Sequence, residues 1–340
     1  ARLRGSDPSQ EVVVGGHRDA WTFGAVDPIS GTVDLVQLGE ALGKAVRAGW
    51  KPQRTIVIGS WDGEELNLFG SAIWADEHEA ELRAGCVAYV NTDEVAYGPT
   101  FGASATPELS GMLVEAARSS TGPDGSPLDA YWRAQDPKLT VDDIGGGSDH
   151  ESFAFHENIP AAQGAFYGPF GTYHSAYDDI ASLRVLDPGM HRAAAAARYT
   201  TLVVMRLASA LVPDVRLSDV GKAMDARLDV FAKRDATPRR AQVAATLRPI
   251  VAAFTKRAAL LDAAVDSAVA AGDAVAGARA YAAVRAAENT FYVPAGVNFG
   301  WSRSLLFGES LLPTLDTTVD ALHGDDALQQ LTTAIVAASR

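Results

Sequence analysis

Through about residue 185, short apolar runs rich in β-branched residues alternate with longer segments in which apolar residues recur at helical spacing. The apolar runs predict strands at residues 11–16, 55–60, 87–91 and 159–165, and the longer segments predict helices at residues 32–48, 71–84 and 107–119. Because strands that alternate with helices build a sheet covered on both faces, we expect an α/β fold.

The pattern changes after about Asp187 and Pro188, where runs rich in Ala, Leu, Arg and Val continue at helical spacing. These runs predict helices at residues 190–211, 220–233, 239–271 and 274–289, and no strand pattern returns. We therefore expect two domains, an α/β domain over residues 1–187 and an α-helical domain over residues 188–340.

The 340 residues have an ordinary globular composition, with 47% hydrophobic and 21% charged residues. The formal net charge of -13 argues against a nucleic-acid partner, which needs a basic surface to meet phosphates. The stretch that comes nearest to a membrane span, Tyr199 to Val212, is too short and contains Arg206. The single cysteine, Cys86, lies in an apolar run, so it predicts a buried thiol and excludes an intramolecular disulfide.

Candidate metal ligands follow the predicted strands at the points where the strands end. His17 follows the first strand, Asp27 lies in the loop after it, Glu64 and Glu65 follow the second strand, and Asp93 follows the third; His174 lies in a loop rich in glycine and aromatic residues. Because sites in open α/β sheets form at the carboxyl ends of the strands, we expect these loops to converge. Mixed imidazole and carboxylate ligands suit zinc, and a carboxylate can bridge two metal ions.

The adjacent residues Glu64 and Glu65 can take two different roles. Adjacent side chains diverge, so one carboxylate can bind metal while the other acts as a general base toward a water molecule. A glutamate pair or a lone histidine is usually an ordinary surface or structural feature. The conjunction of five candidate ligands and this pair at strand ends is what indicates a two-metal hydrolase site.

Four segments closely resemble motifs of the M28 zinc peptidases, in the same order along the chain. They are Gly15–Pro28 (GGHRDAWTFGAVDP), Ser60–Leu66 (SWDGEEL), Asn91–Asp93 (NTD) and Tyr173–Tyr177 (YHSAY). The branch they resemble most is the group of glutamate carboxypeptidase II and the transferrin receptor. The resemblance implies a zinc exopeptidase fold, with a mixed, largely parallel sheet flanked by helices, followed by a helical domain that forms homodimers.

The resemblance also implies how the ligands would divide between two zinc ions per chain. His17 and Asp93 would hold one zinc ion, Glu65 and His174 the other, and Asp27 would bridge the two. Each of these residues occupies the position of a ligand in the family motif.

Further roles follow from the same resemblance. Glu64 would take a proton from the attacking water and deliver it to the leaving amine. Tyr173 would donate its hydroxyl to the developing oxyanion, and Asp19 would be the acid that orients a ligand histidine. The family pattern also implies a cis peptide bond between Asp27 and Pro28.

Substrate-binding positions show where the chain departs from the family. Gly147, Ser148 and Leu68 match positions that line the substrate pocket. Leu305 and Leu306 stand where glutamate-specific relatives have a Lys-Tyr pair that holds the terminal carboxylate of the substrate, and residues 161–166 lack the arginines of those relatives. We therefore do not expect specificity for a C-terminal glutamate, and an apolar side chain beside the two leucines is the alternative.

The sequence leaves calcium binding undecided. Relatives bind calcium through two acids; this chain keeps only one of them, Asp76, and has Ile73 in place of the other. The protease-associated domain that precedes the first motif in the family is not part of this sequence, which starts without methionine or a signal peptide. We expect either a fragment or processed piece of a longer protein, or a partner segment on a separate chain. The resemblance favours a location outside the cytoplasm, secreted or periplasmic.

Three functions remain open from the sequence. The architecture favours a carboxypeptidase acting on peptides or N-acylated amino acids, but the cationic clamp for a carboxylate is missing. An aminopeptidase needs acidic groups for the ammonium of its substrate, and Glu64, Asp93 and Glu94 are available. A receptor-like binding protein is the third reading, although such relatives have lost the metal ligands that this chain keeps.

Overall fold

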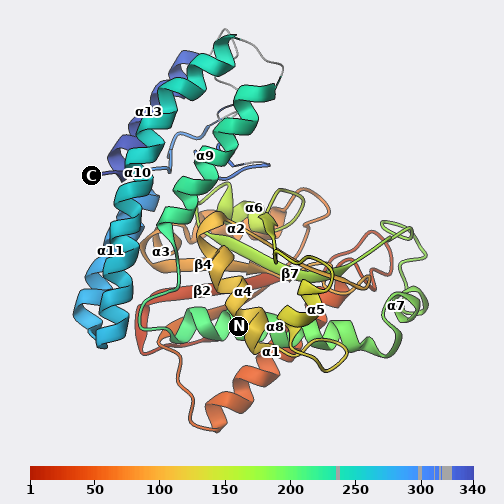
Figure 1. Ribbon diagram of the computed structural model, residues 1–340. Helices are drawn as coiled ribbons and strands as arrows, with labels where there is room; N and C mark the ends of the chain where they lie inside the picture. Colours follow the sequence, from red (N-terminus) through yellow and green to blue (C-terminus); the bar gives the residue numbers. More distant parts are fainter. Residues whose placement is uncertain (235–237, 298–300, 310, 314, 316–323) are drawn as a thin grey trace. The chain divides into compact units, whose positions relative to one another are not determined.

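A computed structural model describes residues 1–234, 238–297, 301–309, 311–313, 315 and 324–340 (Figure 1). The chain forms two compact units. The first comprises Ala1–Ala105, Leu109–Phe153 and Ile159–Ala210, and the second comprises Thr106–Glu108, Ala154–Asn158 and Leu211–Arg340. The first unit thus continues past residue 187, where the sequence pattern changes, and includes one long helix beyond it.

The first unit is built on a seven-stranded sheet in the order β1-β3-β2-β4-β7-β5-β6. Its strands are β1 (Arg2–Leu3), β2 (Asp7–His17), β3 (Arg54–Trp61), β4 (Cys86–Asn91), β5 (Thr100–Ala105), β6 (Val141–Asp143) and β7 (Ala161–Tyr167). Strands β3, β2, β4 and β7 are parallel, β5 and β6 are parallel to each other, and β1 and β5 run antiparallel to β3 and β7. The expected mixed, largely parallel sheet is confirmed.

Helices cover this sheet on both faces, as Figure 1 shows for α1 and α8 below it and α2 above it. The helices of the unit are α1 (Ile29–Arg47), α2 (Phe69–Glu77), α3 (Glu79–Gly85), α4 (Ser110–Ser119), α5 (Leu128–Arg133), α6 (His150–Ala154), α7 (Ile180–Leu186) and α8 (His191–Ser209), with a short 3-10 helix at Pro188–Met190. A second 3-10 helix, Pro107–Leu109, belongs mostly to the second unit. Helix α8 packs against β2, β3, β4 and β7. Because both faces are covered, Val12, Val13 and Val14 are all fully buried, which explains their continuous apolar run.

The second unit is helical. Its helices are α9 (Leu217–Lys233), α10 (Pro238–Ala271), α11 (Ala274–Asn289) and α13 (Gly324–Ala338). Helix α10 packs against α9, α11 and α13, and buries Leu247, Val251, Phe254 and Ala258 along one stripe. Among the described residues, no helix is both long and apolar enough to cross a membrane.

Some elements differ from the expected ones. The single helix expected at residues 71–84 is two helices, α2 and α3, which meet at His78. Strands β5 and β6 carry no strong strand pattern: β5 consists largely of small residues, and β6 has three residues. Their strand conformation comes from pairing with β7 and with each other, which the local sequence does not encode.

The sheet brings together the loops that carry the candidate ligands. His17 lies opposite Trp61 on β3, and Gly15 lies opposite Asn91 on β4, so the three parallel strands end at one edge. Two glycines let the backbone approach closely there. A Cβ at Gly16 would stand 1.8 Å from the carbonyl oxygen of Thr92, and a Cβ at Gly31 would stand 2.2 Å from that of Asp93.

Candidate metal centre

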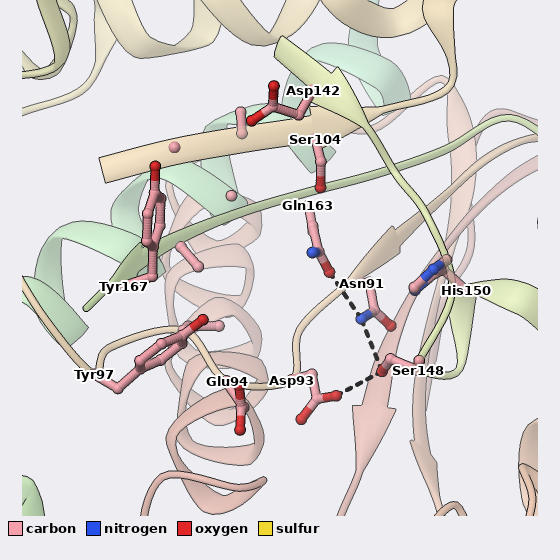
Figure 2. Close-up of a pocket in the computed structure, with 17 residues that line it drawn as sticks. Asn91, Asp93, Glu94, Tyr97, Ser104, Asp142, Ser148, His150, Gln163 and Tyr167 are labelled. Carbon is pink, nitrogen blue, oxygen red and sulfur yellow. Dashed lines mark hydrogen bonds between the residues drawn. The ribbon is translucent and has the colours of Figure 1, made fainter. Parts of the chain in front are cut away.

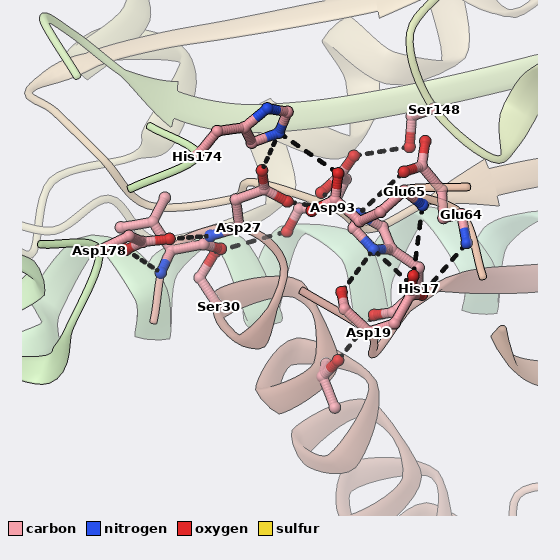
Figure 3. Close-up of polar contacts among 12 residues, drawn as sticks. His17, Asp19, Asp27, Ser30, Glu64, Glu65, Asp93, Ser148, His174 and Asp178 are labelled. Atoms are coloured by element: carbon pink, nitrogen blue, oxygen red, sulfur yellow. Dashed lines mark hydrogen bonds and ion pairs between the residues drawn. The ribbon is translucent and has the colours of Figure 1, made fainter. Parts of the chain in front are cut away.

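The candidate ligands meet at the carboxyl edge of the sheet (Figure 3). His17 is the last residue of β2, Asp93 follows β4, and Glu65 lies in the turn between β3 and α2. Asp27 precedes α1, and its peptide bond to Pro28 is cis, as expected. His174 follows β7 and has a left-handed backbone, with φ of 54°.

The ligand atoms form two groups that share Asp27. The first group is His17, Asp27 and Asp93, the second is Asp27, Glu65 and His174, and the atoms in each lie within 4.8 Å of one another. His17 Nε2 lies 3.1 Å from Asp93 Oδ1 and 3.4 Å from Asp27 Oδ1. His174 Nε2 lies 3.0 Å from Asp27 Oδ2 and 3.4 Å from Glu65 Oε2. The two oxygens of Asp27 thus face opposite histidines, which is the arrangement of a bridging carboxylate.

Asp19 holds the loop that carries the glutamate pair. Its Oδ1 accepts the amide N–H of Glu64 and its Oδ2 accepts that of Glu65, at 3.2 and 3.3 Å. The Nδ1–H of His17 donates to the carbonyl oxygen of Asp19 at 3.0 Å, whereas the Asp19 carboxylate lies 3.6 Å away. With Nδ1 donating to this carbonyl, Nε2 is the ring nitrogen of His17 that faces the cluster and that a metal ion would bind in place of a proton.

A second carboxylate, Asp178, holds the loop that carries Asp27. Its Oδ1 accepts the amide N–H of Val26 at 2.9 Å, and its Oδ2 accepts that of Asp27 at 3.0 Å. Asp178 is 2% exposed, so both bonds are shielded from water. Nothing in the local sequence marked Asp178, which lies four residues after His174 but more than 150 residues from its two partners.

Ser148 supports Asp93 from the other side. Its Oγ donates to Asp93 Oδ2 at 2.7 Å and accepts from Asn91 Nδ2 at 3.1 Å. Ser148 was expected to line the substrate pocket, and it does line a pocket beside the cluster together with Gly147. The sequence motif contains Asn91 without indicating its bond to Ser148, which requires the tertiary fold.

The carboxylates are crowded, and their pKa values show it. Burial raises the pKa of Asp27 to about 7, and the charges of Asp93 and Glu65 add to the rise. Burial likewise raises the pKa of Glu64 to about 8, against the lowering effect of His17. Burial lowers the pKa of His17, but its hydrogen bond to Asp93 and the charges of Asp93 and Glu64 outweigh this and raise it to about 10. Bound cations would relieve this concentration of negative charge.

The residues present fit zinc. Two imidazole nitrogens and three carboxylates are the ligand types that zinc takes in hydrolases. In the described part of the chain, Glu65 Oε1 is buried and has no hydrogen-bond partner, and a buried carboxylate oxygen is costly unless a cation or donor meets it. The two groups therefore suit a pair of metal ions bridged by Asp27.

Tyr173 lies against His174, and Leu68 lies in the loop of the glutamate pair, where its amide N–H donates to the carbonyl oxygen of Glu64. The ring of Tyr173 stacks on His174 at 3.7 Å between centroids, and the side chain is half exposed. Partial burial raises the pKa of Tyr173, and the nearby charges of Asp27 and Glu94 add to the rise, so the phenol is protonated at neutral pH. Leu68 is partly buried, with a left-handed backbone, directly before α2.

Among the described residues, no contact links two further groups of expected residues to this cluster. Leu305 and Leu306 are buried in the second unit, so their place beside a substrate stays a prediction. Ile73 and Asp76 are both exposed on α2, and Ile73 offers no ligand atom, so calcium binding also stays undecided.

Comparison with known proteins identifies the family. The model of peptidase family M28 matches residues 1–200. The chain belongs to peptidase family M28. The matched region holds every member of the ligand cluster, and the resemblance expected from the motifs is confirmed.

Named M28 relatives include both carboxypeptidases and aminopeptidases. Probable glutamate carboxypeptidase LAMP1 of Arabidopsis thaliana is 41% identical over 206 residues, which are 59% of this chain and 30% of the relative. Aminopeptidase NAALADL1 of Mus musculus is 30% identical over 243 residues, 65% of this chain and 33% of the relative. The aminopeptidase from Aneurinibacillus sp. strain AM-1 superposes with a TM-score of 0.47 and 19% identity, over 62% of this chain and 47% of that one. The chain spans about a third of the length of the relatives whose sequences it matches.

Proposed function

We propose that this M28 protein is a di-zinc exopeptidase that hydrolyses peptide bonds or the amide bonds of N-acylated amino acids. The observation that carries the proposal is the position of Asp27, whose two carboxylate oxygens lie 3.4 Å from Nε2 of His17 and 3.0 Å from Nε2 of His174. One carboxylate between two histidines, each with a further acidic neighbour, is a donor set that would hold two metal ions.

The chemistry of the chain's own residues follows from this arrangement. Zinc ions held by these ligands would polarise the scissile carbonyl and lower the pKa of an attacking water. Glu64 would accept the proton of that water and return it to the leaving amine; its Oε2 lies 3.9 Å from Nε2 of His17, close to the ligands but outside both ligand groups. Tyr173 would donate its protonated hydroxyl to the developing oxyanion.

The second part of the proposal concerns which end of a peptide the exopeptidase cleaves. We infer a carboxypeptidase-type architecture without the usual glutamate clamp, with Leu68, Leu305 and Leu306 beside an apolar part of the substrate. Aminopeptidase action is the alternative, since Glu64, Asp93 and Glu94 place carboxyl oxygens at the ligand cluster and its pocket that can accept hydrogen bonds from a substrate ammonium. The relatives named above include both types.

The test of this function combines metal analysis with hydrolysis. Purified protein should contain about two equivalents of zinc after dialysis, and Glu64→Gln should keep the zinc but lower kcat at least about 100-fold. Cleavage of an N-acetylated dipeptide would indicate a carboxypeptidase, and cleavage of an aminoacyl anilide would indicate an aminopeptidase. Protein that takes up no zinc at neutral pH would refute the peptidase and point to a receptor-like binding protein.

Two further properties belong to the same proposal. The helical second unit would form a homodimer, which light scattering of purified protein tests directly by its molar mass. The protein would act outside the cytoplasm, secreted or periplasmic, which fractionation of the source cells would test. Both rest on the resemblance to the carboxypeptidase branch.

A further inference from the structure

A pocket of about 320 Å³ opens beside the ligand cluster, within the first unit. Its walls come from the ends of β4 and β7, from β5 and β6, and from the loop before α6. Figure 2 shows Asp93 toward one end and Asp142 at the other, with Ser104 and Gln163 between them. Because Asp93 is also a candidate metal ligand, a substrate bound at the metal centre can extend directly into this pocket.

One wall of the pocket is held by a chain of hydrogen bonds. Ser148 Oγ donates to Asp93 Oδ2, and Asn91 Nδ2 donates both to Ser148 Oγ and to Gln163 Oε1, the last at 3.2 Å. Since the amide oxygen of Gln163 is used by Asn91, its amide nitrogen is the group that faces the pocket (Figure 2). This wall therefore presents a neutral donor that suits a peptide carbonyl.

The charged groups of the pocket are all acidic. Among the described residues, Asp93, Glu94 and Asp142 line it and no lysine or arginine does. Burial and the charge of Asp93 raise the pKa of Glu94 to about 8, so the charge of the pocket rests on Asp93 and Asp142. The imidazole among them, His150, is buried, and burial lowers its pKa, so it is neutral at neutral pH. Asp142 is exposed on β6, at the end of the pocket away from Asp93. With Asp93 committed to the metal centre, Asp142 is the carboxylate left free at the far end, where an anionic side chain would be repelled and a cationic one attracted.

We propose that this pocket binds the cationic side chain of a basic residue next to the scissile bond, with the Asp142 carboxylate pairing with the cation. The inference rests on the proposed peptidase function and names its substrate class, peptides with Lys or Arg at that position. A long side chain suits the pocket because the pairing carboxylate stands at the end away from the metal centre. Between the two ends, the neutral amide of Gln163 forms part of the pocket wall.

The experiment uses dipeptides that differ only in Lys, Gln or Glu, placed in turn at each position flanking the scissile bond. At one of the two positions kcat/KM should fall in the order Lys, Gln, Glu, with Lys about two- to fivefold above Gln at low ionic strength, the range of an ion pair with an exposed carboxylate. Asp142→Asn should bring the ratio of Lys to Gln close to one. Asp143→Asn is the matched control, since it removes the same charge from the next residue of β6, which does not line the pocket, and it should keep most of the ratio.

Two results would overturn the inference: equal kcat/KM for the Lys and Glu peptides at both positions, or an unchanged Lys to Gln ratio in Asp142→Asn. Calorimetric binding of the same peptides to zinc-loaded Glu64→Gln separates the pocket from the chemistry. Tighter binding of the Lys peptide that depends on Asp142 would support the pocket even if the wild-type protein cleaved none of them. In that case the proposed function would fail and the binding preference would stand.

Discussion

Asp178 joins the loop that carries Asp27 to the loop that carries His174. Its two carboxylate oxygens each accept one amide N–H, from Val26 and from Asp27. Asp178→Asn keeps the volume of the side chain but supplies a single oxygen, and its NH2 group must then face one of the two N–H donors. At 2% exposure, water cannot replace the lost acceptor.

The size of the effect follows from these contacts. One hydrogen bond to a charged acceptor is lost, worth about 1.5–3 kcal/mol, and one buried N–H is left without an acceptor, at a cost of about 1–3 kcal/mol. The two terms overlap, because relaxation of the loop relieves both, so we expect the free energy of unfolding to fall by about 3 kcal/mol. Since one of the two amides belongs to Asp27, zinc affinity should also fall about 10- to 100-fold.

The neighbouring Asp179 provides a matched control. Its Oδ1 alone accepts the N–H groups of Ala181 and Ser182 at the start of α7, so the single oxygen of Asp179→Asn can keep both bonds. All tryptophans except Trp301 belong to the first unit, so tryptophan fluorescence during urea unfolding reports mainly on that unit. Equal unfolding midpoints and equal zinc affinities in the two variants would refute the role assigned to Asp178.

Three other predictions test separate features of the first unit. Tyr173→Phe should lower kcat about 100- to 1000-fold while zinc content stays the same, because it removes only the hydroxyl; unchanged kcat would exclude the phenol as an oxyanion donor. Gly31→Ala places a Cβ 2.2 Å from the carbonyl oxygen of Asp93 and should lower both the unfolding midpoint and zinc affinity. Gly39→Ala on the same helix meets its nearest atom only at 4.0 Å and should raise stability by up to about 1 kcal/mol, and similar behaviour of the two variants would contradict the close packing at Gly31. Burial raises the pKa of Asp34 to about 7, with a smaller opposing effect of its hydrogen bond from Thr200. The folded protein therefore holds this proton up to higher pH than the unfolded chain does. The contribution of Asp34 to the free energy of unfolding is fully present below about pH 4 and is lost as the pH rises to 7, by up to about 4 kcal/mol. Asp34→Asn should lack this part of the pH dependence, and parallel stability curves for variant and wild type between pH 4 and 8 would disprove it.

Much of the candidate site could be predicted because its residues are local to strand ends. His17 directly ends an apolar β-branched run, and Asp93 follows the next such run closely. In a parallel sheet the carboxyl ends of strands meet at one edge, so the convergence of these residues follows from topology alone. The structure brings the five residues together as two groups that share Asp27, and which metal ion each group would hold stays a prediction.

Features that depend on pairing between distant segments could not be predicted. Strand β5 consists largely of small residues and becomes a strand only because β7 and β6 pair with it. Asp178 lies 151 residues from Asp27, and no local pattern shows that its carboxylate accepts that amide. Asp142 becomes part of a pocket only because β6 is placed at the edge of the sheet beside β5.

By itself the sequence determined the chemistry that this protein can carry: the alternation of strands and helices, the five candidate ligands and the paired glutamates. Those features depend on single residues and on short repeats of apolar and polar positions, which the local sequence shows directly. Only the tertiary structure decided which oxygen of Asp27 faces which histidine, which carboxylates hold the loops, and that the pocket beside Asp93 is acidic. The reason is physical, because hydrogen bonds and electrostatic fields depend on distances between atoms, and the fold sets those distances for residues far apart in the chain.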